Sequence, residues 1–227
     1  MKLPLLHVIA TDDVVEATGF DPLAAELVAA GRDTIALHLR LGRAGSRDFC
    51  DRAERLAAAA RASGAWCAVN GRVDVALVAG AQAVQLGSGA LPVEAVRRIA
   101  GTRLAIGASV HSAEEGRTRA RDGADYLVAG SVFTTATHPN RTPAGPELVT
   151  SCGTAGVPVI AIGGVDETNA ALAVAAGATG VAVIRAVWQD TDPVGTALRL
   201  IEVVRQAAAR QDARKGCRAS GTGAGRE

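Results

Sequence analysis

The fold is decided by the stretch VPVIAIGGVDETNAALAVAAGATGVAVIRAV, residues 157–187. It opens with an apolar run, VPVIAI, continues through a helix-period segment, DETNAALAVAAG, and reaches a second apolar run, GVAVI. Short, near-continuous apolar runs joined by a helix are typical of parallel strands covered by helices. The stretch therefore predicts one strand–helix–strand unit.

The same alternation extends along the chain. Helix-period segments, several closed by a glycine, separate the apolar runs. The eight strand-like runs are residues 5–10, 34–40, 66–69, 83–86, 103–108, 125–130, 157–162 and 180–184. Eight such units favour a closed barrel, and we predict a single (β/α)8 TIM barrel over residues 1–209. The alternative, a doubly wound open sheet, needs a Gly-rich turn after its first strand, where the sequence has ATDD (10–13).

Residues 210–227 are rich in Gly, Arg and Ser and have almost no apolar content. Such a composition cannot offset the entropy of ordering, so we predict a disordered tail.

Composition excludes several functional classes. The chain has 24 Lys and Arg against 23 Asp and Glu, and only 3% aromatic residues. This balance argues against a nucleic-acid partner and against an anionic membrane surface. No apolar segment reaches the length of a membrane span, and we expect a cytoplasmic protein. The four cysteines form no CxxC pair, which argues against a zinc site.

The strongest site signal is the AIGGV segment, followed about 20 residues later by GVAVIRAV. Gly163 and Gly164 leave backbone N–H groups open, and helix N-termini are expected at 166–168 and after Ile184 and Arg185. Backbone N–H groups at helix starts bind phosphate without needing a lysine. We therefore predict a phosphate site after the last two strands. The competing interpretation is a tight turn that requires glycine.

Three more polar residues follow other strands, at the barrel face where active sites lie. Arg40, Asn70 and Ser109 are predicted to contact the substrate. Each has a structural alternative: a rim arginine, a turn residue and a helix N-cap.

A long loop, residues 131–147, follows the sixth strand and is rich in Thr, Pro and Gly. Loops of this length over an active-site face are usually functional. Thr135, Thr137 and His138 are its polar candidates. The alternative is a passive lid.

Four segments together resemble the thiamine phosphate synthase/TenI family. They are VNGRVDVALVAGAQAVQLG, SVHSAEEG, GADYLVAGSVFTTATHP and the stretch quoted first, and the resemblance runs from about Leu37 to Val187. It implies a (β/α)8 barrel that binds a small thiazole phosphate and acts in thiamine biosynthesis. The oligomeric state stays open, a homo-oligomer included.

The synthases of this family join a pyrimidine pyrophosphate to the thiazole phosphate, and their motifs are only partly kept. Where the synthases have a QLREK-type motif, this chain has HLRLG (38–42), which keeps the arginine and loses the lysine. The NDR motif is replaced by NGR (70–72), and the GSGAL segment (87–91) lacks the second expected aspartate. His138 occupies the position of a loop lysine. A pyrophosphate leaving group needs its charge neutralised, normally by Mg²⁺ and cations. Two missing carboxylates leave no oxygen cage for Mg²⁺. We therefore expect no metal and no cofactor, with Mg²⁺ required only if the chain is a synthase.

The TenI branch resembles thiazole tautomerases, which move a proton on a thiazole carboxylate phosphate and need an acid/base but no metal. Some members place a catalytic histidine where this chain has Ser131. His38, His111 and His138 are substitutes by chemistry, and His38 ranks first because its strand faces the site. For each histidine a core or surface role is the alternative.

The leading functional hypothesis is thus a TenI-like isomerase acting on a thiazole phosphate. A thiamine phosphate synthase with a degenerate Mg²⁺ site is the second hypothesis. A non-catalytic protein that binds a phosphorylated ligand is the third.

Overall fold

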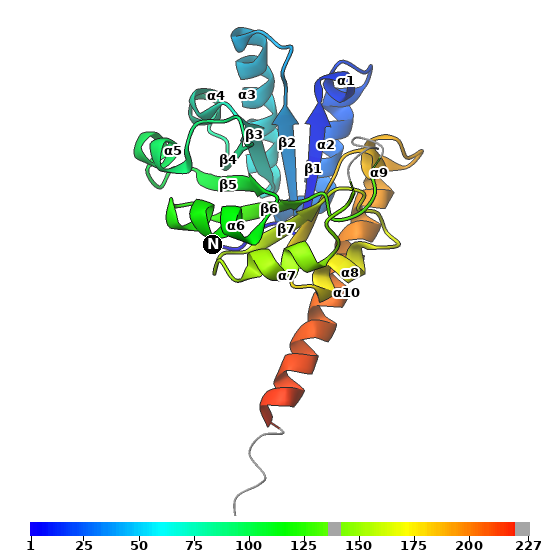
Figure 1. Ribbon diagram of the computed structural model, residues 1–227. Helices are drawn as coiled ribbons and strands as arrows, with labels where there is room; N and C mark the ends of the chain where they lie inside the picture. Colours follow the sequence, from blue (N-terminus) through cyan, green and yellow to red (C-terminus); the bar gives the residue numbers. More distant parts are fainter. Residues whose placement is uncertain (136–141, 221–227) are drawn as a thin grey trace, which may run out of the picture.

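The computed structural model describes residues 1–135 and 142–220, with 214–220 described by their backbone only. Its eight strands are all parallel and close into a barrel in chain order, β1 to β8 (Figure 1). The strands are β1 (Leu6–Thr11), β2 (Ile35–Arg40), β3 (Trp66–Asn70), β4 (Ala83–Leu86), β5 (Ala105–Val110), β6 (Tyr126–Gly130), β7 (Val159–Ile162) and β8 (Gly180–Val183). Each begins and ends within two residues of its predicted run, and the (β/α)8 prediction is confirmed.

Helices surround the barrel. In the described residues they are α1 (Asp12–Val15), α2 (Phe20–Gly31), the short 3₁₀ helix η1 (Arg32–Thr34), α3 (Ser46–Ser63), α4 (Val73–Val78), α5 (Val93–Ala100), α6 (Ala113–Arg121), α7 (Glu147–Gly153), α8 (Ala170–Ala175), α9 (Arg185–Trp188) and α10 (Pro193–Ser220). No helix in these ranges has the length and apolar content needed to cross a bilayer.

The helices bury their apolar faces against the outside of the barrel. One large cluster joins strand residues such as Leu37 and Leu127 to helix residues such as Phe49 and Leu200. In a strand, successive side chains point to opposite faces, so the alternate residues point into the barrel. A second cluster fills that interior with small and medium side chains, including Ala68, Ala83, Ala105 and Ala182. Removing all this apolar surface from water is the main favourable term in folding.

The barrel interior also holds polar side chains. His7, His38, Gln85 and Tyr126 are each at most 4% exposed. His7 Nδ1 and His38 Nε2 lie 2.8 Å apart, and the His7 ring is tilted against Tyr126 at 5.7 Å between centroids. Within the described chain, the Tyr126 hydroxyl, Gln85 Oε1 and His7 Nε2 find no hydrogen-bond partner. Polarity in this layer therefore lowers the stability that the barrel would otherwise have.

The last helix extends beyond the barrel boundary predicted at residue 209. α10 is a single helix of 28 residues and continues past residue 209 to Ser220. It projects well beyond the barrel in Figure 1, where it is orange to red. Alanines, arginines and glutamines are strong helix formers, which explains why the polar composition of this segment did not end the helix. Residues 221–227 lie outside the described chain.

The buried Tyr126 hydroxyl provides a stability test. Replacing Tyr126 with Phe removes a hydroxyl that is desolvated without a protein partner and keeps the ring packing. We expect the free energy of unfolding to stay constant or to rise by up to about 1 kcal/mol, as measured by urea denaturation. Tyr126→Ala, which removes the ring, is the control and should lose about 3–5 kcal/mol. A clear loss of stability in Tyr126→Phe would contradict this view of the interior.

Candidate functional site

A cavity of about 570 Å³ opens at the C-terminal ends of the strands. Its size matches pockets that hold small organic ligands. Its lining comes from the ends of β2, β5, β6, β7 and β8 and from segments that follow β4 to β8. Val128, Ile162 and Ala182 of the inner barrel face contribute apolar surface. The cavity therefore lies at the barrel face where the sequence predicts the site.

Most of the predicted site residues meet in this cavity. The residues of the prediction that line it are Arg40, Ser109, Ser131, Thr135, Gly163, Gly164, Ile184 and Arg185. Asn70 and His38 do not line it, and Thr137 and His138 lie outside the described residues. The polar residues Ser88, His111, Thr134 and Asp166 join the lining.

Gly163 and Gly164 form the tightest part of the site. Their φ angles are +100° and +65°, a region that side chains strongly disfavour. A Cβ on Gly163 would lie 2.7 Å from Ser131, and one on Gly164 would lie 2.2 Å from the Thr134 carbonyl oxygen. In the described chain, the backbone N–H groups of both glycines donate no hydrogen bond. Glycine is thus required here by space as well as by conformation, and both N–H groups are available to a ligand.

The two predicted helix N-termini have different outcomes. α9 does begin at Arg185, with Ile184 as its N-cap, and the N–H groups of its first turn have no intrahelical acceptor. α8 begins only at Ala170, later than the 166–168 start that we predicted. The intervening turn satisfies its own amides, because Asp166 N–H donates to Asn169 Oδ1 at 3.0 Å and Thr168 N–H to Asp166 Oδ1 at 2.9 Å. The glycine turn and α9, together here called the phosphate cup (Gly163, Gly164 and Arg185–Val187), therefore carry the anion-binding potential.

Charge in the cavity favours an anion. Arg40 and Arg185 both line it, and Asp166 is its acidic lining residue. One carboxylate oxygen of Asp166 already accepts hydrogen bonds from the N–H and hydroxyl of Thr168. Arg185 donates to the Thr135 hydroxyl at 3.3 Å, which joins the segment after β6 to α9. The two guanidinium groups suit phosphate or carboxylate groups of a ligand.

Ser109 and Arg40 both line the cavity, and Ser109 is not the helix N-cap. Ser109 belongs to β5, and the N-cap of the following helix is Ser112. The Ser109 hydroxyl accepts a hydrogen bond from Gln85 Nε2 at 3.1 Å. It thus retains its own O–H as a donor toward the cavity.

Of the histidines that the structure describes, His111 is the one that lines the cavity. Its backbone follows β5, and its Nδ1 contacts the Gly130 carbonyl oxygen. A carbonyl only accepts, so Nδ1 carries the hydrogen and Nε2 holds the lone pair of the neutral ring. His38 ranks above His111 in the sequence prediction because the strand of His38 is expected to face the site.

His38 lies within the barrel, one inward-facing position below Arg40 on β2. Its Nε2 faces His7 and its Nδ1 lies 3.2 Å from Asn70 Oδ1, so both ring nitrogens are occupied. Burial lowers the pKa of His38 to about 4. Burial also holds the pKa of His7 well below its usual value, and the neighbouring His38 adds to this shift. This geometry does not favour direct proton transfer between His38 and a ligand in the cavity. The alternation of polar and apolar residues in LLHVIA and TIALHLR was the signal for an inward-facing histidine pair.

The same pKa shift predicts how stability depends on pH. The folded-state pKa of His38, about 4, lies below its ordinary value of 6.5. The unfolded chain therefore binds the proton first, and the free energy of unfolding should fall as the pH drops from 6.5 toward 4. Melting temperatures between pH 8 and pH 4 measure this effect. His38→Gln keeps a polar side chain but cannot titrate, so its melting temperature should fall less steeply as the pH drops. An identical fall in the variant would refute the lowered pKa of His38 as its cause.

The glycine turn gives a sharper test with a matched control. Gly164→Ala and Gly177→Ala both place an alanine at positive φ, but the Cβ at 177 meets nothing within 4 Å. Both variants should lose about 1–2 kcal/mol of stability from backbone strain. Gly164→Ala must also push the segment after β6 outward, so we expect it to bind inorganic phosphate about tenfold more weakly in calorimetry. Equal phosphate affinity in the two variants would remove the glycine turn from the site.

Comparison with known proteins gives a consistent result. The family described as thiamine monophosphate synthase matches residues 6–187. The chain is 45% identical over 157 residues to the thiamine biosynthesis bifunctional protein ThiM/ThiE of Symbiobacterium thermophilum, with 68% of this chain and 33% of that protein covered. It is 41% identical over 167 residues to the thiamine-phosphate synthase of Gloeobacter violaceus, with 73% and 49% covered. The chain thus spans about a third and about half of these two curated relatives.

A solved structure agrees in fold over nearly its whole length. Thiamine phosphate pyrophosphorylase from Pyrococcus furiosus superimposes with a TM-score of 0.80 at 35% identity, covering 91% of this chain and 97% of that one. The family match spans all eight strands, the seven connections between them and the phosphate cup. The chain belongs to the thiamine phosphate synthase/TenI family.

Proposed function

We propose that this chain is an enzyme of thiamine biosynthesis that binds a thiazole carboxylate phosphate and moves a proton on its ring without a metal. The observation that carries the proposal is the phosphate cup, whose open backbone N–H groups and neighbouring Arg185 suit one phosphate. Arg40, on another strand end of the same cavity, is a suitable partner for the carboxylate.

The residues after β3 and β4 support a reaction with one phosphorylated ligand. Mg²⁺ prefers carboxylate oxygens, and the two positions that supply them in the synthase pattern hold Gly71 and the GSGAL segment (87–91). Within residues 1–135 and 142–213, no three His, Cys, Asp or Glu side chains converge on a metal position. The donor set around the cavity therefore does not fit a Mg²⁺-pyrophosphate, and no step of the proposed reaction uses one.

His111 is the proposed acid/base. Its Nε2 lone pair accepts the proton from the ring carbon and returns it to a different ring position, so reactant and product are isomers. The Ser131 hydroxyl, which lines the same cavity, is available to hydrogen-bond the ligand. A protein cavity that holds the phosphate and the carboxylate at fixed points brings the ring to the base in one orientation.

A synthase reaction is the second candidate. The Gloeobacter violaceus relative, at 41% identity, is named a thiamine-phosphate synthase, and the Pyrococcus furiosus structure, at 35% identity, is named a thiamine phosphate pyrophosphorylase. The cavity also reaches from the phosphate cup on β7 and β8 to Arg40 on β2 and Ser88 after β4, so its extent is compatible with a second ligand.

Turnover assays separate the candidates. Ring-proton exchange of the thiazole carboxylate phosphate in D2O, followed by NMR with EDTA present, should be catalysed by the wild-type chain. Mg²⁺-dependent formation of thiamine phosphate from pyrimidine pyrophosphate and thiazole phosphate, at a rate exceeding that exchange, would favour the synthase. Binding of the thiazole phosphate with neither reaction would indicate a non-catalytic ligand-binding protein.

The histidine assignment has its own test. His111→Asn should reduce the exchange rate by about 10²–10⁴-fold, because it removes the proton acceptor, while the ligand's Kd changes little. His38→Asn serves as the comparison and should keep most of the exchange, since His38 lies below the cavity. If His38→Asn abolishes exchange and His111→Asn does not, the assignment is wrong.

A further inference from the structure

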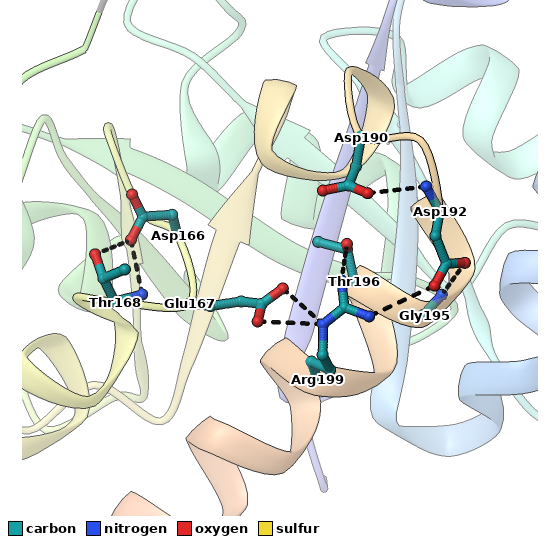
Figure 2. A network of polar contacts seen from close by, with 8 residues as sticks. All are labelled: Asp166, Glu167, Thr168, Asp190, Asp192, Gly195, Thr196 and Arg199. Carbon is teal, nitrogen blue, oxygen red and sulfur yellow. Dashed lines mark hydrogen bonds and ion pairs between the residues drawn. The ribbon is translucent and has the colours of Figure 1, made fainter.

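Arg199, on the second turn of α10, contacts two separate loops. Its Nε lies 3.0 and 3.2 Å from the two carboxylate oxygens of Glu167, and its Nη1 lies 3.5 Å from Asp192 Oδ2. Its Nη2 donates to the hydroxyl of Thr196, a residue that is 3% exposed. Figure 2 shows the guanidinium group between the two acidic side chains.

The first of these loops continues directly from the glycine turn. Glu167 follows Asp166, which lines the cavity. The segment is cross-linked within itself, because Asn169 Nδ2 donates to the Gly164 carbonyl oxygen at 2.8 Å and Asp166 binds Thr168. Hydrogen bonds therefore link the residues on both sides of Glu167 to each other and to Gly164.

The second loop continues from α9. Asp192 closes a turn in which its N–H donates to Asp190 Oδ1 at 2.8 Å and its Oδ1 accepts from Gly195 N–H at 3.0 Å. α9 itself is attached to the barrel by Trp188, whose indole N–H donates to the Ile9 carbonyl oxygen at 2.9 Å. Arg199 is thus the side chain that joins the β7–α8 loop to the turn following α9.

We propose that Arg199 is a positioning residue that holds the two halves of the phosphate cup at a fixed separation. The planar guanidinium group presents its N–H donors in fixed directions, so one side chain binds carboxylates from two loops and limits their relative movement. This role rests on the proposed phosphate site, because the two loops it joins are the two that carry the cup.

The ion pairs of Arg199 are exposed to solvent, so the positioning role can be tested without unfolding the protein. The side chains of Arg199, Glu167 and Asp192 are 50%, 37% and 63% exposed. Exposed ion pairs contribute little to stability because solvent screens them and ordering the side chains costs entropy. Substitution of Arg199 should therefore leave the fold intact and act on ligand binding.

Arg205 provides a matched control on the same helix. It is 56% exposed and forms its ion pair with Glu202, within α10, at 2.7 Å. Binding of inorganic phosphate and of thiazole phosphate by calorimetry should weaken about three- to tenfold in Arg199→Gln, and by less than about twofold in Arg205→Gln. Glu167→Gln should weaken binding similarly, and the double variant should be no worse than the single ones because both break the same contact.

Hydrogen exchange separates this proposal from the proposed function. In ligand-free protein, Arg199→Gln should speed exchange of the backbone amides at 164–168 and 185–187, with the other barrel amides unchanged. If the wild-type chain binds neither phosphate probe, the proposed function fails, while the exchange result still decides whether Arg199 orders the two loops. Unchanged exchange, or unchanged phosphate affinity in a binding-competent protein, would overturn the positioning role.

Discussion

Parallel pairing of β1 with β8 is the constraint on which the rest of the structure depends. Leu6 pairs with Val181 and Val8 with Val183, and this ladder converts eight strands into a closed ring with no free edge. Closure brings the last strand, which carries half of the phosphate cup, next to the first. It also directs the C-terminal end of every strand to one face, where a single cavity collects residues from five strands and from the segment after β4.

Some polar residues of the strands are buried in the barrel interior, and others line the cavity. On β2, His38 is sealed inside the barrel while Arg40, two residues later, lines the cavity. The layer below the cavity is uncharged at neutral pH, because burial lowers the pKa of both interior histidines. The positive charge of the barrel mouth is thus concentrated at the rim, where it attracts an anionic ligand.

Backbone, rather than side chains, forms the central part of the site. Gly163 and Gly164 contact the segment after β6 so closely that any side chain would collide with it. A phosphate held by main-chain N–H groups needs no particular side chain there. Under the proposed function, a phosphate could therefore still bind at the glycine turn in a chain whose synthase-type motifs have changed.

The sequence predicted the strands well because each is an apolar run bounded by polar or glycine residues, and the run encodes burial directly. It predicted the glycine turn for the same local reason. The start of α8 was missed because Asp166, Thr168 and Asn169 bond to one another, which depends on side-chain geometry that composition does not reveal. The catalytic ranking of His38 went beyond what alternation supports. An inward-facing residue of β2 either lines the cavity, as Arg40 does, or is buried inside the barrel, as His38 is. The sequence pattern does not show how far along the barrel axis the cavity extends.

The central claim is that the phosphate of the ligand lies between the loops after β7 and β8. A crystal structure of the chain soaked with thiazole phosphate measures this directly. The account predicts phosphate oxygens at about 3 Å from the backbone nitrogens of Gly164 and Arg185. A phosphate bound instead at Arg40, with the glycine turn in no contact with the ligand, would contradict it.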